Sequence, residues 1–263
     1  MTDSFRYIFG PVHSWRLGSS LGVDPLTSHD KICNMDCVYC QLGKTTQLTY
    51  ERKIYVELKD VLHEISRVPL DTVDHITFSG RGEPTLALNL GELIRGIKKT
   101  RPEKVAVLTN SSLMDRLDVR DDLMRADFVL AKIDAGDQLV FEKVVGGKAL
   151  DLKKIVEGIK DFRRTFKGKL ALQIMLIDDN FENIRQIAQV ARSIGADEVE
   201  LDTPLRPCGV KPLNRELMQK AKTLFADMPV VSVYDLPHKE YTPMDERATI
   251  KRHGNFKKTT FSI

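Results

Sequence analysis

The sequence Cys33-Asn-Met-Asp-Cys37-Val-Tyr-Cys40 places three thiols on one short loop. Thiolates are soft, anionic ligands that suit iron-sulfur clusters and zinc. Three closely spaced cysteines, with Cys208 as the one other cysteine of the chain, do not form the paired framework of a secreted disulfide-rich domain. The stretch therefore predicts thiols that are kept reduced in order to bind a metal.

The number of thiols limits what this loop can hold. Structural zinc sites and electron-transfer clusters are closed by four protein ligands, whereas the loop supplies three. A zinc knuckle completed by His29 or Cys208, or a non-enzymatic iron-sulfur electron carrier closed by Cys208, would fill the fourth position. Without such a ligand, one iron of a [4Fe-4S] cluster stays open.

Around the cysteines, short apolar runs alternate with amphipathic helical patterns, which is typical of repeated βα units and a parallel sheet. The predicted strands cover residues 20–24, 75–78, 105–108, 128–130, 170–177 and 199–201. The predicted helices include residues 58–65, 90–97, 152–162, 184–194 and 214–227. Six such units predict an α/β fold, a partial (β/α)6 TIM-like barrel.

We assign residues 1–228 to this core domain and residues 229–263 to a short C-terminal extension, with a weak strand pattern at 230–234. Ligands of parallel α/β sheets bind at the carboxyl ends of the strands, where the βα loops converge. The residues that follow each strand are therefore the candidate site residues.

Two of the strand ends carry glycines or small polar side chains. Gly80 and Gly82 permit backbone conformations and close ligand approach that other residues forbid, although Gly82-Glu-Pro84 is also an ordinary turn sequence. Asn110 and Ser111 could bind a ligand or cap the next helix.

The remaining strands carry larger polar residues. Lys132 and Asp134 face the same way on their strand, and they could bind a ligand or form a structural ion pair. Gln173 interrupts an apolar strand, and a buried amide needs partners. Asp202 and Arg206 follow the last strand, where Arg206 is either a substrate contact or a solvated loop cation.

The spacing CxxxCxxC directly after the first strand of a βα barrel resembles that of the radical S-adenosylmethionine (SAM) superfamily. The resemblance implies a [4Fe-4S] cluster on Cys33, Cys37 and Cys40, whose open iron is chelated by the amino and carboxylate groups of SAM. It also implies one-electron reduction of SAM to methionine and a 5′-deoxyadenosyl radical, which abstracts hydrogen from a substrate.

The same resemblance implies roles for residues around the cluster. Gly82, Glu83 and Pro84 match a Gly-Gly-Glu-like motif that binds the SAM amino group, and Tyr39 is similar to an aromatic residue near the adenine. Tyr39 could equally pack on the barrel rim. We expect cofactor contacts from Tyr39, Gly80, Gly82, Glu83, Pro84, Asn110, Ser111, Asp134 and Gln173, and substrate contacts from Lys132, Asp202 and Arg206.

Further stretches are similar to the branch that contains the tRNA wyosine synthases, namely 9–18, 22–24, 41–45, 203–204 and 206–207. Archaeal wyosine synthases carry a second cluster with three cysteines of its own, which this chain lacks. The flavodoxin-like donor domain of the eukaryotic enzymes is also lacking. The resemblance therefore implies an external electron donor such as flavodoxin or ferredoxin.

Composition adds expectations about location and substrate. No stretch reaches the roughly 20 apolar residues that span a bilayer, and the start of the chain lacks a basic leader, so we expect a cytoplasmic protein with no membrane partner. The net charge of +3 does not by itself call for nucleic acid. Tail cations nevertheless favour RNA, such as a tRNA base, as substrate over a small molecule or a peptide, the alternative being a solvated tail. These cations are Arg247, Lys251, Arg252, Lys257 and Lys258.

Overall fold

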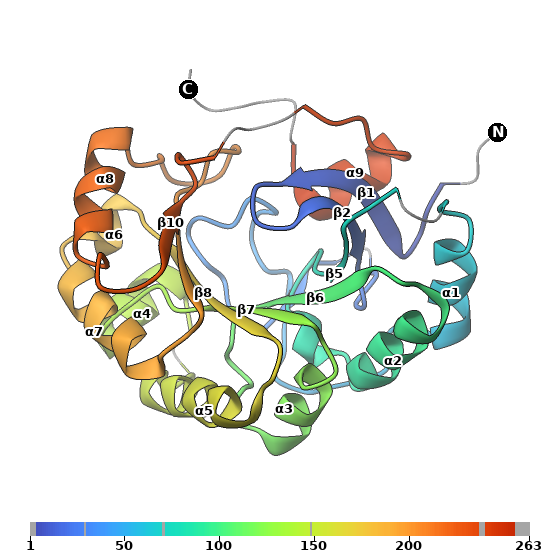
Figure 1. Ribbon diagram of the computed structural model, residues 1–263, viewed down its shortest axis with the longest axis horizontal. Coiled ribbons are helices and arrows are strands. Elements are labelled where there is room, and N and C mark those ends of the chain that lie inside the picture. The colour runs from blue at the N-terminus through green and yellow to red at the C-terminus, as the bar shows by residue number, and fades with distance from the viewer. Residues whose placement is uncertain (1–3, 29, 70–71, 148, 237–239, 256–263) are drawn as a thin grey trace.

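The structure is a computed structural model that describes residues 4–28, 30–69, 72–147, 149–236 and 240–255. Within these residues, eight strands form one curled sheet in the order β1-β2-β5-β6-β7-β8-β9-β10 (Figure 1). Neighbouring strands are parallel, except that β1 is antiparallel to β2. The predicted α/β half-barrel is confirmed.

The elements have the following bounds. The strands are β1 (Ile8–Ser14), β2 (Gly18–Val23), β3 (Ile32–Cys33), β4 (Gln47–Leu48), β5 (His75–Phe78), β6 (Lys104–Thr109), β7 (Phe128–Lys132), β8 (Lys169–Met175), β9 (Glu198–Asp202) and β10 (Val230–Ser232). The helices are α1 (Leu58–Ile65), α2 (Leu90–Thr100), α3 (Leu117–Leu123), α4 (Gln138–Val145), α5 (Leu152–Thr165), α6 (Asp178–Phe181), α7 (Ile184–Ile194), α8 (Arg215–Thr223) and α9 (Glu246–His253), with a 3₁₀ turn at Pro84–Leu86.

The predicted strands correspond to β2, β5, β6, β7, β8 and β9, and the weak pattern at 230–234 corresponds to β10. Strand β1 was missed. Gly10 and Pro11 interrupt its alternation, Pro11 cannot donate to a ladder, and the pairing with β2 shifts register between Phe9 and Val12. The hairpin β1–β2 therefore adds an antiparallel edge to a sheet that was predicted to be wholly parallel.

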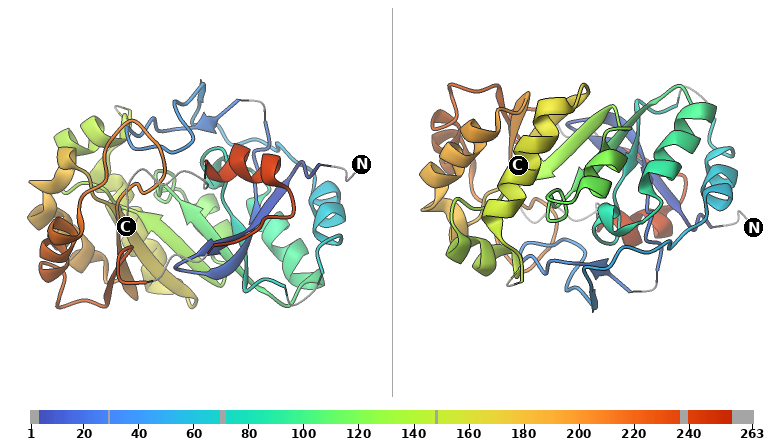
Figure 2. Two further views of the ribbon diagram at one scale, coloured as in Figure 1. Left: turned by 90° about the horizontal axis from the view of Figure 1, so that it is seen from above. Right: turned by 90° about the horizontal axis from the view of Figure 1, so that it is seen from below.

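The two faces of the curled sheet bury different residues. Helices α2, α3 and α5 cover the outer face (Figure 2), where they enclose the main apolar core. Inside the barrel, Phe128 and Leu130 of β7 pack with Ala106 and Ala171. Because side chains alternate along a strand, the next inward residue after Leu130 is Lys132. The barrel interior thus changes from apolar to polar toward the carboxyl ends of the strands.

The described residues after 228, namely 229–236 and 240–255, pack on the core. Strand β10 pairs with β9, and α9 packs against β1, where the Gly10 amide donates to Thr249 Oγ1 at 2.9 Å. Arg252 is buried, with Nε 3.3 Å from Asp24 Oδ2. Its expected place among the RNA-binding tail cations is therefore wrong, and so, for this residue, is the alternative of a solvated tail. The assignment of residues 229–263 as a separate extension stays a prediction.

Two predicted tail cations, Lys257 and Lys258, lie outside the described residues, as does His29. None of the helices in the described ranges has the length and apolar character needed to cross a lipid bilayer.

Candidate functional site

The cysteine loop, residues 33–40, is fixed by backbone hydrogen bonds to three other segments. Strand β3 pairs with β4 on one side. The Asp36 amide donates to the Val145 carbonyl at 2.9 Å, at the end of α4. The Ile32 amide donates to the Arg81 carbonyl at 3.2 Å, beyond the end of β5. These bonds hold the loop beside the carboxyl ends of the parallel strands, as the sequence predicted.

The thiols of this loop lie in a shielded environment. The pKa of Cys33 is raised to about 11, chiefly by burial and to a lesser extent by the nearby Glu83 and Cys40. Burial raises the pKa of Cys37 to about 12, again with a contribution from a neighbouring thiol, Cys33. Iron cations would remove the protons and offset the charge of the thiolates. The three thiols, of which Cys33 is buried and Cys37 and Cys40 are half-buried, thus form a donor set that fits an iron-sulfur cluster.

The described residues give no support to a mononuclear metal site. No three His, Cys, Asp or Glu side chains among them lie close enough to bind one metal ion. Cys208, the predicted fourth ligand of an electron carrier, donates to the Val210 carbonyl at 3.3 Å, and its pKa is raised by burial and, to a lesser extent, by Cys40. Cys208 is therefore near the loop but hydrogen bonded within its own segment.

Gly82 lies directly against the backbone that precedes the cysteine loop. Its φ is +155°, and a Cβ at this position would lie 1.6 Å from the Ile32 carbonyl oxygen. Gly80, with φ of +125°, would place a Cβ 2.7 Å from the Asp24 carboxyl carbon. The glycines were predicted to allow close approach, and the groups that approach them here are the start of the cysteine loop and a buried aspartate.

Glu83 is buried and connects the ends of β5 and β6. Its carboxylate accepts hydrogen bonds from the Thr85 amide at 3.0 Å, Thr85 Oγ1 at 2.7 Å, Thr109 Oγ1 at 2.6 Å and the Asn110 amide at 2.6 Å. A carboxylate has about four lone-pair sites, so these donors use its capacity. Burial raises the pKa of Glu83, although the donors oppose the shift. The predicted contact of Glu83 with the SAM amino group stays a prediction.

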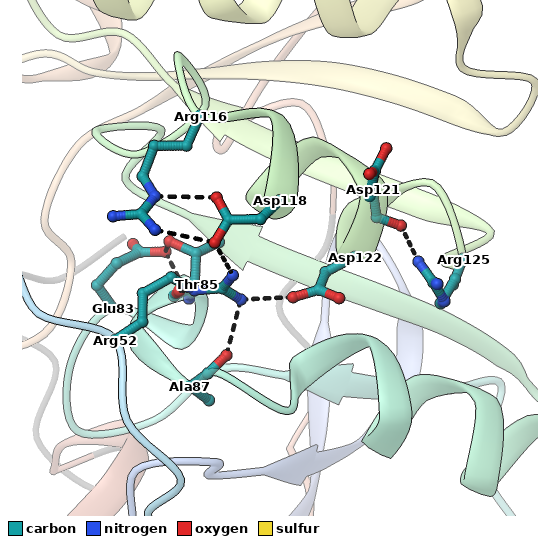
Figure 3. A network of polar contacts seen from close by, with 9 residues as sticks. All are labelled: Arg52, Glu83, Thr85, Ala87, Arg116, Asp118, Asp121, Asp122 and Arg125. Atoms are coloured by element: carbon teal, nitrogen blue, oxygen red, sulfur yellow. Dashed lines mark hydrogen bonds and ion pairs between the residues drawn. The ribbon is translucent and has the colours of Figure 1, made fainter.

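Arg52 supports the turn that contains Glu83 (Figure 3). Its guanidinium donates to the carbonyls of Thr85 at 2.8 Å and Ala87 at 2.9 Å, and it pairs with Asp118 at 2.7 Å and with Asp122. The pKa of Asp118 is well below its usual range because of the Arg116 hydrogen bonds and then those of Arg52. The 3₁₀ turn that starts at Pro84 is thereby tied to α3.

The loop after β6 also contacts the cysteine loop. Asn110 Nδ2 donates to Asn34 Oδ1 at 2.8 Å and lies 3.8 Å from Cys33 Sγ. Asn34 Nδ2 donates to Ser112 Oγ at 2.6 Å. Ser111 has φ of +68°, is fully buried, and its hydroxyl has no hydrogen-bond partner within the described ranges. A strained residue with an unpartnered buried hydroxyl is a feature of ligand sites.

Tyr39, Lys132 and Asp134 form one contact group, in which the Tyr39 hydroxyl donates to Asp134 Oδ2. The Met175 amide donates to Asp134 Oδ1 at 2.7 Å, and Lys132 Nζ lies 3.5 Å from Oδ2. Lys132 also lies 4.9 Å from the centre of the Tyr39 ring. The ion pair considered for Lys132 and Asp134 is therefore present, and Tyr39 is a buried residue that links the cysteine loop to β7.

Sequence reasoning missed a cation inside the barrel. Arg16, at the tip of the β1–β2 hairpin, pairs with Glu200 at 2.5 Å and with Asp202 of β9. Gln173 Nε2 donates to Asp202 Oδ2 at 2.7 Å, which confirms that this amide is buried with a partner. Burial raises the pKa of Glu200 to about 7, against the opposing effect of Arg16. An acid inside the apolar strand Val199–Leu201 was the signal that could have revealed this cluster.

Arg206 does not lie in open solvent. Its guanidinium donates to the His253 carbonyl at the end of α9, and burial lowers its pKa to about 10. The interpretation of Arg206 as a solvated loop cation is therefore wrong. Its predicted role as a substrate contact is not tested by these contacts and stays a prediction.

Comparison with known proteins identifies the class of this fold and site. A sequence-family model described as the radical SAM superfamily matches residues 27–191, which include the whole cysteine loop. The chain belongs to the radical SAM superfamily. It is an enzyme whose cofactors are a [4Fe-4S] cluster and SAM, as the resemblance implied.

Particular relatives agree with this result. The UPF0026 protein of Synechocystis sp. is 39% identical over 242 residues, covering 89% of this chain and 88% of the relative. The structure of TYW1 with a lysine-pyruvate adduct bound has a TM-score of 0.62 at 18% identity, covering 81% of this chain and 76% of that one. SAM-bound SuiB of Streptococcus suis has a TM-score of 0.60 at 15% identity, covering 77% of this chain and 48% of that one. At such low identities the solved structures show the fold alone.

Proposed function

We propose that Cys33, Cys37 and Cys40 hold the cluster and that this chain cleaves SAM to start radical chemistry on a substrate. The observation that carries the proposal is the set of buried and half-buried thiols, electrostatically coupled through Cys33, in a loop hydrogen bonded to the segments that end β5 and α4. When bound, a [4Fe-4S] cluster supplies one electron to SAM, which gives methionine and a 5′-deoxyadenosyl radical. The electron comes from an external donor of the flavodoxin or ferredoxin type.

The residues around the loop have two kinds of role in this proposal. Glu83 and Asn110 fix the ends of β5 and β6 against the cysteine loop through the hydrogen bonds given above. The Ser111 hydroxyl, buried without a partner in the described part of the chain, is available to a polar group of SAM. Tyr39, held by Asp134, limits movement of the loop and helps exclude water.

The test of this function is anaerobic reconstitution of the whole chain with iron and sulfide, followed by chemical reduction in the presence of SAM. We expect iron and sulfide to be taken up and 5′-deoxyadenosine and methionine to form in equal amounts. A loaded and reduced protein that produces no 5′-deoxyadenosine would contradict the proposal.

For the substrate, we propose RNA, and specifically a tRNA base. Arg247 and Lys251 are exposed on α9, which ends beside Arg206 and the cysteine loop. A phosphate backbone bound there would bring a base toward the carboxyl ends of the strands. The resemblance to the wyosine synthase branch supports the same substrate class.

The RNA proposal predicts salt-dependent binding that depends on these cations. Replacing both Arg247 and Lys251 with Ala should weaken binding of bulk tRNA and reduce the salt slope by about one for each phosphate that these cations neutralise. A double Ala variant of Lys153 and Lys154, exposed on α5, is the matched control and should bind as the wild type does. Removing the cations by ending the chain at Asp245 would not be a suitable alternative, since it would also remove α9 and expose β1. The proposal would be contradicted if the Arg247 and Lys251 variant bound tRNA as tightly as the Lys153 and Lys154 variant, or if tRNA binding did not respond to salt.

A further inference from the structure

Lys31 is a buried cation that lies against one of the thiols. Lys31 as a whole residue is 3% exposed. Its ammonium donates to Cys40 Sγ at 3.0 Å and to the Gly43 carbonyl at 2.7 Å. A neutral thiol is a weak acceptor, and burying an ammonium is costly without a charged partner. Lys31 therefore places a buried positive charge directly against the sulfur of Cys40, where a thiolate bound to iron would supply its charged partner.

The backbone of Lys31 is fixed from both sides. Its amide donates to Thr46 Oγ1 at 2.9 Å, and its carbonyl accepts from the Gln47 amide at 3.0 Å. These bonds belong to the pairing of β3 with β4, which returns the chain toward the cysteine loop. The ammonium is consequently held at Cys40 by the fold of the loop, and it is shielded from solvent.

We propose that Lys31 raises the reduction potential of the cluster by stabilising the additional negative charge of its reduced state. The inference rests on the proposed function, since it takes Cys40 as a cluster ligand. The step is transfer of one electron from the external donor, which is oxidised by one electron, and no bond forms or breaks. Lys31 acts through Cys40 and does not touch SAM or substrate.

The physical basis is the interaction of a fixed positive charge with a couple whose negative charge grows by one unit on reduction. Hydrogen bonds to cluster sulfurs and local charge are established determinants of such potentials. A buried pair is screened by solvent and salt much less than an exposed one. Loss of the ammonium should therefore disfavour the reduced state more than the oxidised state.

The test is a redox titration of the reconstituted cluster in the Lys31→Met variant, followed by the electron paramagnetic resonance signal of the reduced form. Met keeps an unbranched side chain and removes the charge. We expect the ratio of reduced to oxidised cluster at a fixed potential to fall by about tenfold, equivalent to about 59 mV for a one-electron couple. Iron content per chain should equal that of the wild type.

The matched control is Lys44→Met, which removes the same charge from an exposed position beyond Cys40 in the sequence. We expect no comparable change there. An unchanged potential in iron-loaded Lys31→Met, or an equal shift in both variants, would overturn the inference while leaving the proposed function intact. If Lys31→Met takes up no iron, Lys31→Gln, which keeps a donor without the charge, must show the lowered potential. A wild-type chain that assembles no cluster would overturn both proposals.

Discussion

Replacing Cys37 with Ser is expected to abolish SAM cleavage and to remove most of the bound iron. A hydroxyl is a poor substitute for a thiolate as a ligand of iron in a cluster, and the Cys37 thiol, whose pKa is raised to about 12 chiefly by desolvation, is set among the other thiols of the loop. Mutation of a residue that only hydrogen bonds to a metal ligand typically lowers metal affinity or activity by about 10–100-fold. Loss of a ligand itself should therefore reduce 5′-deoxyadenosine formation by at least about 100-fold. Iron, sulfide and 5′-deoxyadenosine per chain are the measurements.

Cys208→Ser is the matched control, because it makes the same atomic change at a cysteine near the loop that is hydrogen bonded to Val210. We expect it to keep both iron and SAM cleavage. A Cys208→Ser variant that loses its cluster would contradict the assignment of three ligands and would favour an electron carrier closed by a fourth thiolate.

The second large effect is expected for Gly82→Ala, which should lower both the free energy of unfolding and the iron content. The added Cβ would lie 1.6 Å from the Ile32 carbonyl oxygen, so the backbone before Cys33 must move. A residue held in a sparsely populated backbone region costs about 1–3 kcal/mol, and the collision adds to that cost. Urea unfolding of the metal-free protein and iron analysis after reconstitution would measure the two effects separately.

Gly195→Ala provides the comparison for backbone strain alone. Gly195 ends α7 with φ of +66°, and a Cβ there would meet nothing within 4 Å. We expect a stability loss of about 1–2 kcal/mol and no change in iron content. If the two Ala variants behaved alike, close approach of the cysteine loop to Gly82 would not be what requires glycine.

The sequence predicted the parallel strands well because their burial on both faces leaves continuous apolar runs. His75–Phe78 was predicted with the bounds that β5 has in the structure. The β1–β2 hairpin was not predicted, since Pro11 and the irregular register conceal its strand pattern. The hydrophobic pattern of a sequence reveals a strand whose pairing is regular. The pattern is lost where the pairing is interrupted.

The candidate site was predicted only in part, because sequence patterns show spacing along the chain and not the contacts that folding creates. The cysteines were evident from spacing, and the strand-end residues from the rule that ligands bind at carboxyl ends. Lys31 and Arg16 were not identified, because their importance depends on contacts with Cys40 and Glu200 that only the folded chain creates. No periodicity distinguishes a lysine before a cysteine loop from a solvated one.

The Arg16 ion pairs also have a consequence for protein engineering. The tip of the N-terminal hairpin reaches Glu200 and Asp202 on β9. These ion pairs connect the first two strands of the chain to its sixth βα unit. A shortened protein made only of residues 27–191, the part that the family model matches, would lack these ion pairs together with β1, β2 and β9. An affinity tag or fusion partner should accordingly be attached so that the hairpin remains free to insert into the barrel.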